Sequence, residues 1–271
     1  MKTSQTRPAV ITAILLMAVN GLLYLAPIYR LVGADAVLWI NNLTDIVVAL
    51  VSIWLGFRLW RSTERGESQW WIWGSLLTGV ICWAIAEIIW DSYQLFTNNK
   101  LPSASPADLA WILGYIALTT GLILRLRAFR MRPKKRWQFA VLAAYGVLAV
   151  LVVIYMIIPT LQEAPTGVFY KKFIDVFYPI CDLALGLLAL LLVLVLEGGL
   201  LSRPWATIAL ACLCVAISDL LYAFAIAQGI YQVDPAAGLN VLSYMIDVSY
   251  TFAYILMALG LYLQARLLDA I

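Results

Sequence analysis

Long apolar stretches alternate with short polar connections along the whole chain. A helix that spans a membrane needs about 20 mostly apolar residues, and eight stretches of that kind are present. They cover residues 9–29, 37–60, 70–96, 107–129, 137–158, 172–196, 205–229 and 239–267. The pattern predicts an all-α polytopic membrane protein with eight transmembrane helices, in a single membrane domain over residues 1–271.

The composition agrees with this prediction and narrows the function classes. The chain is 64% hydrophobic and 12% charged, whereas soluble domains carry about 25% charged residues. The first apolar stretch has no convincing cleavage site, so no cleavable signal peptide is expected. Histidine is absent, which excludes His-based catalysis and His-ligated metal sites. No nucleic-acid-binding motif is present, and we expect no nucleic-acid partner.

The distribution of basic residues predicts the orientation in the membrane. With the N-terminus placed inside, 14 of the 18 Lys and Arg residues lie at the inner side and 4 at the outer side. Such a bias is typical of cytoplasmic loops. We therefore predict a multi-pass protein of the bacterial inner (plasma) membrane with both termini in the cytoplasm. The basic run at 125–136 is interpreted as a topology anchor, and binding of anionic lipid is the alternative.

The second half of the chain repeats the first. Residues 82–90 align with 214–222, residues 108–127 with 247–266, and residues 44–50 with 181–187. The matched positions include acids and aromatic residues as well as apolar ones. The alignment predicts two parallel four-helix repeats, residues 1–132 and 133–271, related by a pseudo-two-fold axis along the membrane normal.

Acids inside the apolar stretches are the candidate functional residues, because carboxylates in hydrocarbon are costly and usually face a cavity or a partner. Three acids in the first half match three in the second half, and their positions predict a location in the outer half of the membrane. Aromatic residues share their helix faces at i+3, i+4 and i+7. The predicted ligand-binding residues are Asp45, Glu87, Asp91, Asp108, Trp111, Tyr115, Asp182, Asp219, Tyr222, Asp247, Tyr250 and Tyr254.

Two interpretations of these acids stay open. Acids interleaved with aromatic rings hold an organic cation or a polar ligand by charge and cation–π contact. Alternatively, protonated acids bond to Tyr hydroxyls, Asn41, Asn42 or Ser218 and hold the helices together. A magnesium or calcium site is a further option, since oxygen ligands suit these ions. The residues indicate no particular cofactor.

The segment LPSASPADLAWILGYIALTTGLILRLR (101–127) resembles a recurring element of bacterial multi-span sensor regions that precede diguanylate cyclase, c-di-GMP phosphodiesterase or histidine kinase domains. The element has a Pro-Ser-x-Ala-Asp stretch, then aromatic and Gly-Tyr positions, and a Gly-Leu helix that ends in Arg. Pro106 stands where family members vary. The resemblance implies a ligand-sensing membrane module. No effector-domain sequence is expected after the last span, so signalling would need a separate partner, or the chain is an excised or stand-alone version. The matching residues are Ser105, Ala107, Asp108, Trp111, Gly114, Tyr115, Gly121 and Arg125.

Three functions are compatible with the sequence. A sensor or ligand-binding module would take a small polar or cationic ligand from the extracytoplasmic side and signal through its cytoplasmic helix ends to a partner. A proton- or cation-coupled transporter would suit the parallel repeats, but the inner halves of the spans have few polar residues. A lipid hydrolase would use paired carboxylates, but no nucleophile–base spacing is present. We favour the sensor and predict no catalytic residue. The predicted partners are the lipid bilayer, the small ligand, a cytoplasmic signalling protein and a second copy of the chain.

Overall fold

The computed structural model describes residues 3–97, 105–129, 135–162, 169–196, 202–231 and 240–271. Every regular element in these ranges is helical. In chain order the elements are α1 (Thr3–Leu23), α2 (Ala26–Val32), α3 (Ala34–Arg61), α4 (Ser68–Thr97), α5 (Pro106–Phe129), α6 (Arg136–Val152), the π-helical turn η1 (Val153–Ile157), α7 (Ile158–Gln162), α8 (Phe169–Val195), α9 (Ser202–Ala227) and α10 (Val241–Leu267).

The predicted all-α polytopic fold is confirmed. Eight helical segments of the described chain are long and apolar enough to cross a membrane, and they correspond to the eight predicted stretches. The chain is therefore a multi-pass integral membrane protein whose solvent is a lipid bilayer. Two boundaries differ from the prediction by more than three residues. The first stretch is divided at residues 24–25, because α2 begins anew with a proline in its first turn, and proline has no N–H to continue a helix. The fifth predicted stretch continues beyond residue 158 and ends at Gln162, after η1 and α7.

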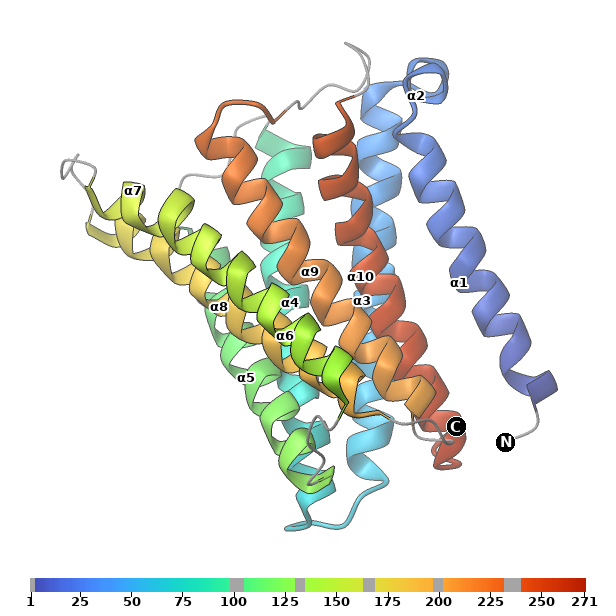
Figure 1. Ribbon diagram of the computed structural model, residues 1–271. Helices are drawn as coiled ribbons and strands as arrows, with labels where there is room; N and C mark the ends of the chain where they lie inside the picture. The colour runs from blue at the N-terminus through green and yellow to red at the C-terminus, as the bar shows by residue number, and fades with distance from the viewer. Residues whose placement is uncertain (1–2, 98–104, 130–134, 163–168, 197–201, 232–239) are drawn as a thin grey trace.

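Six of the spanning helices form a closed ring. The neighbours around it are α3, α4, α5, α8, α9, α10 and again α3 (Figure 1). The order α3–α4–α5 in the first half has its counterpart in α8–α9–α10 in the second. The two remaining spans pack differently, because α1 lies against α10 whereas α6 lies against α8. The two-repeat interpretation, with its boundary at residues 132/133, stays a prediction.

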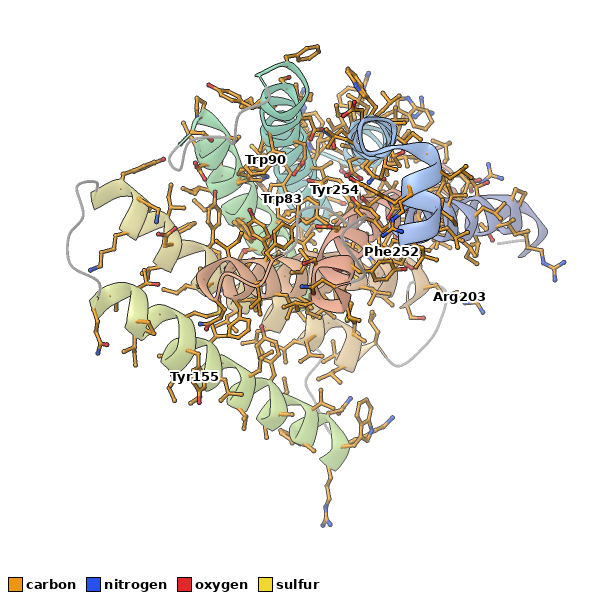
Figure 2. The ribbon with its side chains drawn as sticks, turned by 90° about the horizontal axis from the view of Figure 1, so that it is seen from above. Trp83, Trp90, Tyr155, Arg203, Phe252 and Tyr254 are labelled. Carbon is orange, nitrogen blue, oxygen red and sulfur yellow. The ribbon has the colours of Figure 1, made fainter. Side chains whose placement is uncertain are left out.

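The outer faces of α1 and α6 are apolar and open to the lipid. On the segment from α6 through η1, Val147 and Tyr155 are about three-fifths exposed, and Tyr155 points away from the ring (Figure 2). In water such a surface would be unfavourable, but hydrocarbon solvates apolar side chains well, and the helix satisfies its own backbone groups. Lipid contact therefore explains why these two helices bury so little of their surface.

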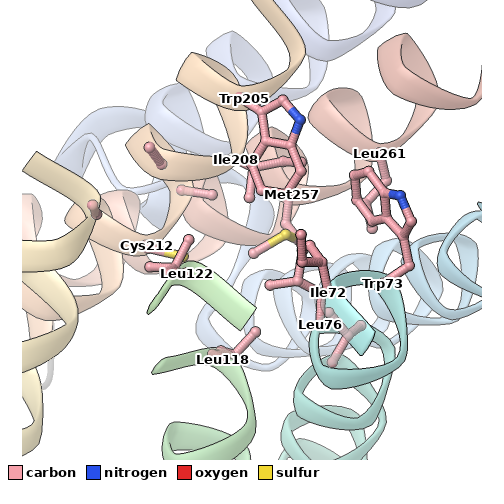
Figure 3. Packing of buried hydrophobic residues seen from close by; sticks show 14 of the residues in the cluster. Ile72, Trp73, Leu76, Leu118, Leu122, Trp205, Ile208, Cys212, Met257 and Leu261 are labelled. Atoms are coloured by element: carbon pink, nitrogen blue, oxygen red, sulfur yellow. The ribbon is translucent and has the colours of Figure 1, made fainter. Parts of the chain in front are cut away.

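The centre of the ring is filled by side chains at the end that carries the chain termini. Trp73 on α4 packs against Trp205 on α9 with ring centroids 4.9 Å apart, and both rings are fully buried. Leu118, Ile208 and Leu261 belong to the same buried apolar cluster (Figure 3). This half of the ring is closely packed and mainly apolar, and the guanidinium carbon of the buried Arg125 lies 4.2 Å from the centroid of the Trp205 ring.

The acids lie mainly at the opposite end. Both termini lie at one end of the bundle; α3, α5, α8 and α10 run toward that end and α4 and α9 run away from it (Figure 1). Asp108 and Asp247 are near the beginnings of α5 and α10, and Asp219 is in the last third of α9. Asp182 is deeper, at the midpoint of α8. Which end faces the cytoplasm stays a prediction.

Candidate functional site

Tyr115 on α5 bridges two acids of the second half of the chain. Its hydroxyl is within hydrogen-bonding distance of Asp182 Oδ1 and lies 2.7 Å from Asp219 Oδ2. Tyr115 and Asp182 are almost completely buried. Three helices, α5, α8 and α9, meet at this point. We refer to Tyr115, Asp182 and Asp219 as the Tyr115 cluster.

Glu87 on α4 is the centre of a second cluster. Its Oε1 atom accepts hydrogen bonds from the hydroxyls of Tyr250 at 2.8 Å and Tyr254 at 2.9 Å, both on α10. The indole N–H of Trp111 on α5 donates to the same oxygen at 3.4 Å. Three donors on one oxygen stabilise an ionised carboxylate. All three donors to this oxygen are neutral groups, two phenols and an indole.

Asp45 and Asp91 adjoin Glu87 but are incompletely bonded. Asp45 Oδ2 accepts a 3.2 Å hydrogen bond from Thr251, whereas Asp45 Oδ1 and Asp91 Oδ2 are buried and have no hydrogen-bond partner among the described residues. We define the Glu87 cluster as Asp45, Glu87, Asp91, Trp111, Tyr250, Thr251 and Tyr254. Trp111 and Tyr115 are one turn apart on α5, so this helix connects the two clusters.

The two clusters are built in the same manner across the two halves of the chain. In each of them a tyrosine from one half binds acids of the other half. Tyr115 of the first half binds Asp182 and Asp219, and Tyr254 of the second half binds Glu87. A relative movement of the halves would therefore change both clusters at once.

Asp108 has a local role that the sequence did not reveal. Its Oδ2 atom accepts hydrogen bonds from the backbone N–H of Ser105 at 2.6 Å and from the Ser105 hydroxyl at 3.2 Å. This contact caps the first turn of α5, in the way that an acid three residues after an N-cap serine does. Its Oδ1 atom accepts from Tyr178 at 2.8 Å. Asp108 is thus occupied by the helix end and by α8.

Asp247 and Tyr222 lie in a third, smaller group. Asp247 accepts a 2.7 Å hydrogen bond from Tyr231, and the Tyr222 ring packs edge-on against that of Tyr231. Burial raises the pKa of the Tyr231 phenol, and the charge of Asp247 raises it further, so Tyr231 stays protonated and donates. Tyr231 follows the end of α9 in a connecting segment. Tyr231 lies outside the predicted spans, where helical periodicity does not indicate a facing residue.

Aromatic rings fill the space between the acids. The Trp83 ring packs edge-on against the Tyr115 ring with centroids 5.5 Å apart, and the ring centroids of Trp90 and Trp111 are 5.8 Å apart. Trp83, Trp90 and Tyr254 lie in the interior of the bundle (Figure 2). A cavity of about 20 Å³ lies beside Trp83 and Tyr254, and its lining is completed by Ser52, Val80, Ala211, Val215, Ala253 and Met257. That volume is enough for about one water molecule.

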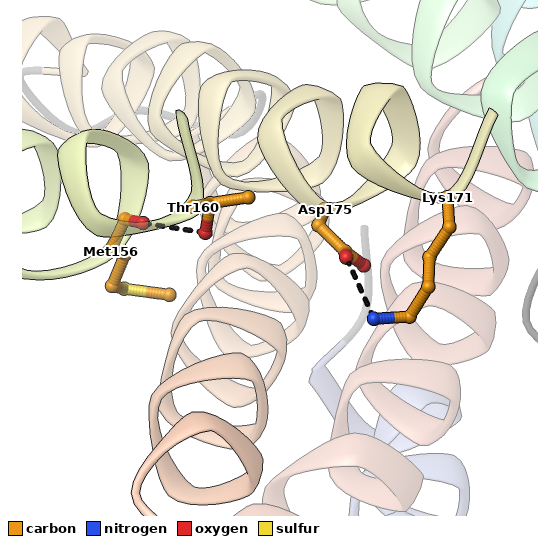
Figure 4. A network of polar contacts seen from close by, with 4 residues as sticks. All are labelled: Met156, Thr160, Lys171 and Asp175. Atoms are coloured by element: carbon orange, nitrogen blue, oxygen red, sulfur yellow. Dashed lines mark hydrogen bonds and ion pairs between the residues drawn. The ribbon is translucent and has the colours of Figure 1, made fainter. Parts of the chain in front are cut away.

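The remaining acid of α8 is a surface residue. Asp175 shares a helix face with Tyr178 and Asp182, but it forms an ion pair with Lys171 at 3.2 Å on an exposed part of the helix (Figure 4). No group of three or more Cys, Asp or Glu side chains in the described part of the chain is arranged to hold a metal ion. Residues 130–134 of the basic run and 101–104 of the sensor-like segment lie outside the described residues.

The structure therefore brings nine of the twelve predicted residues into two adjoining clusters. Asp108, Asp247 and Tyr222 have other partners. Comparison of the chain with protein-family models, with curated proteins and with solved structures gives no match. Function has to be inferred from the side chains and their geometry.

Proposed function

We propose that the chain is an integral membrane sensor or ligand-binding module. Its site is the pair of acid–aromatic clusters, and its output is a change in the relation between the two halves. The hydrogen bonds of Tyr115 and Tyr254 to acids of the opposite half carry the proposal. A ligand that binds one of these carboxyl groups displaces the tyrosine hydroxyl that is bonded to it. Such a ligand therefore favours a different arrangement of the halves.

The helix ends near the termini would pass this change to a partner. Helices α5 and α10 carry Tyr115 and Tyr254 and continue to Phe129 and Leu267 at the other end of the bundle. A rigid helix transmits a tilt along its length. The resemblance of residues 101–127 to bacterial sensor regions supports the same function, and the predicted orientation places these helix ends in the cytoplasm.

The packed half of the ring favours sensing over transport. Trp73, Trp205 and their neighbours fill the centre of the bundle between the acids and the end with the termini (Figure 3). A transport path through this core would require several large buried side chains to move apart. A sensor requires only a small tilt of the helices that surround this core.

The experiment is a distance measurement between spin labels at Ala128 and Leu268, exposed positions at the ends of α5 and α10. The four free cysteines are first replaced by alanine. Choline, spermidine and a change of pH serve as probes on reconstituted protein. We expect at least one probe to shift the distance distribution, and Glu87→Gln combined with Asp219→Asn to abolish the shift. An unchanged distribution with all three probes would contradict the sensor, and flux of a probe into vesicles would favour the transporter.

A further inference from the structure

Two carboxylate oxygens in the Glu87 cluster are buried without a hydrogen-bond donor from the described part of the chain. Asp45 Oδ1 and Asp91 Oδ2 are sealed from solvent and accept no hydrogen bond from a described residue. The exposed fractions of the two residues are 9% and 4%. They come from different helices, α3 and α4, and flank Glu87. A buried carboxylate without donor, cation or water is strongly unfavourable, whereas a neutral carboxyl group is tolerated.

The hydrogen-bond donors to these acids are all neutral in the described part of the chain. None of the hydrogen bonds that the acids of the two clusters make to described residues comes from Lys or Arg. The titratable groups that face them from the packed elements are carboxyls, phenols and a thiol. They are Tyr24 after α1, Glu87 on α4, Asp108 and Tyr115 on α5, Tyr145 on α6, Tyr178, Cys181, Asp182 on α8, Asp219 and Tyr222 on α9, Tyr231 after α9, and Asp247, Tyr250 and Tyr254 on α10.

Glu87 differs from its two neighbours because three donors converge on one of its oxygens. It is the acid of this cluster that the structure equips to carry the charge. Asp45 has one neutral donor, Thr251, on its other oxygen. Protonation of Asp45 and Asp91 therefore removes the negative charge from the two acids that have too few donors. It leaves the charge on Glu87, which has three.

A proton fits this site better than a larger cation does. The two oxygens have no exposed surface, so an ammonium group or a hydrated ion would need new space beside them. The described residues offer no metal-binding group. A proton neutralises a carboxylate and occupies no additional volume.

The Tyr115 cluster needs a proton for a separate reason. A phenol has one hydrogen to donate, yet the Tyr115 oxygen is within hydrogen-bonding distance of both Asp182 and Asp219. The second contact is a full hydrogen bond when one of the carboxyl groups is protonated and donates to the phenol oxygen. The pair of acids then holds a single proton and a single negative charge.

We infer that the ligand of this module is the proton, bound by Asp45, by Asp91 and jointly by Asp182 and Asp219 in the packed state that the structure shows. The inference rests on the proposed function and names its ligand. On release, each carboxyl group loses a proton to water and becomes a carboxylate. The packed state leaves Asp45 Oδ1 and Asp91 Oδ2 without a donor among the described residues, and it gives Asp182 and Asp219 one phenol hydrogen between them. Deprotonation therefore favours a state in which water enters and the halves move apart.

The first test is infrared spectroscopy of the full chain in lipid at about pH 7, where ordinary Asp and Glu side chains are ionised. We expect a carbonyl band of protonated carboxyl groups. Asp45→Asn and Asp91→Asn should each remove part of it, and the double variant should remove most of what these two acids contribute. Asn has the shape of neutral Asp, so the variants keep the packing. Asp175→Asn, in the exposed ion pair, is the control and should leave the band unchanged.

The second test is thermal stability between about pH 5 and about pH 9, a range that spans the proposed release. A folded state that holds more protons than the unfolded state loses stability as the pH rises. We expect the melting temperature of the wild type to fall with rising pH, and that of the Asp45→Asn, Asp91→Asn variant to fall less. Asp175→Asn should follow the wild type.

In the infrared test, the absence of a protonated-carboxyl band in the wild type, or a band that both substitutions leave intact, would overturn the inference.

The two failures are distinguishable. If the infrared band responds as expected but the distance between labels at Ala128 and Leu268 stays constant across the same pH range, protons bind and the sensor function is wrong. If that distance changes with choline or spermidine while the band is absent, the sensor function stands and the proton is not its ligand.

Discussion

Tyr254 on α10 donates a 2.9 Å hydrogen bond to Glu87 on α4, across 167 positions of the chain. Tyr250, one turn earlier on α10, donates to the same oxygen at 2.8 Å. Since α4 and α10 are not neighbours in the helix ring, these side chains join them across its interior. The stability of this contact therefore reports on the arrangement of the two halves.

The substitution Glu87→Gln tests the charge on this acceptor. The amide keeps the size of the side chain but offers a neutral oxygen to three donors, and hydrogen bonds to charged groups are worth about 1.5–3 kcal/mol each in soluble proteins. Since hydrogen bonds in membrane proteins average about 0.6 kcal/mol, we expect a total loss of about 1–3 kcal/mol. Unfolding in detergent mixtures measures it. Glu67→Gln, at an exposed position before α4, is the control and should change stability by less than about 0.5 kcal/mol.

The substitution Tyr115→Phe tests the bridge between Asp182 and Asp219. Removal of the hydroxyl deprives both buried acids of a hydrogen-bond partner, and we expect a loss of about 1–3 kcal/mol. The matched control is Tyr155→Phe, because the Tyr155 ring is exposed toward the lipid on η1. Equal stability of the two variants in the same unfolding assay would show that the Tyr115 hydroxyl contributes nothing to the fold.

The spanning helices were predictable from the sequence because a bilayer permits few alternatives. Backbone groups in hydrocarbon must bond within the segment, so long apolar stretches become helices. The gathering of acids was predictable for a related reason, since a carboxyl group on an apolar helix turns away from lipid. Periodicity then identified Trp111 and Tyr115 as residues on the same face as Asp108.

The partner of each acid was not predictable. Asp108 shares a face with Trp111 and Tyr115, yet Ser105 and Tyr178 occupy it, because a helix end needs a cap wherever it lies. Tyr231 reaches Asp247 from a connecting segment, where helical periodicity gives no information. The neighbours of α1 and α6 were not predictable either, because these two helices have apolar residues on every face. Helices that are apolar all round show no preferred face.

The cap of α5 leads to a local prediction. Asp108→Ala removes the acceptor of the Ser105 backbone N–H, and loss of an N-terminal cap costs about 0.5–2 kcal/mol. We expect faster hydrogen exchange in the first turn of α5. The hydrogen bonds of the Glu87 cluster should persist. Thr120→Ala is the control, because Thr120 is exposed on the same helix and bonds only to its own backbone at Ile116. Protection of the first turn that is identical in both variants would refute the capping role.

The buried Trp83 ring packs directly against Gly114, where a larger residue has no room. A Cβ atom at position 114 would lie 2.2 Å from Cδ1 of the buried Trp83 ring, far inside contact distance. Gly114→Ala must therefore displace Trp83, which also touches Tyr115, and overpacking of this kind costs about 1–3 kcal/mol. At Gly146 on α6 a Cβ atom would meet nothing within 4 Å. Gly146→Ala should therefore be neutral, or stabilise by about 0.5–1 kcal/mol through the higher helix propensity of alanine. If both variants unfold at the same denaturant fraction, the indole of Trp83 is free to move, and the Tyr115 cluster does not depend on it for its position.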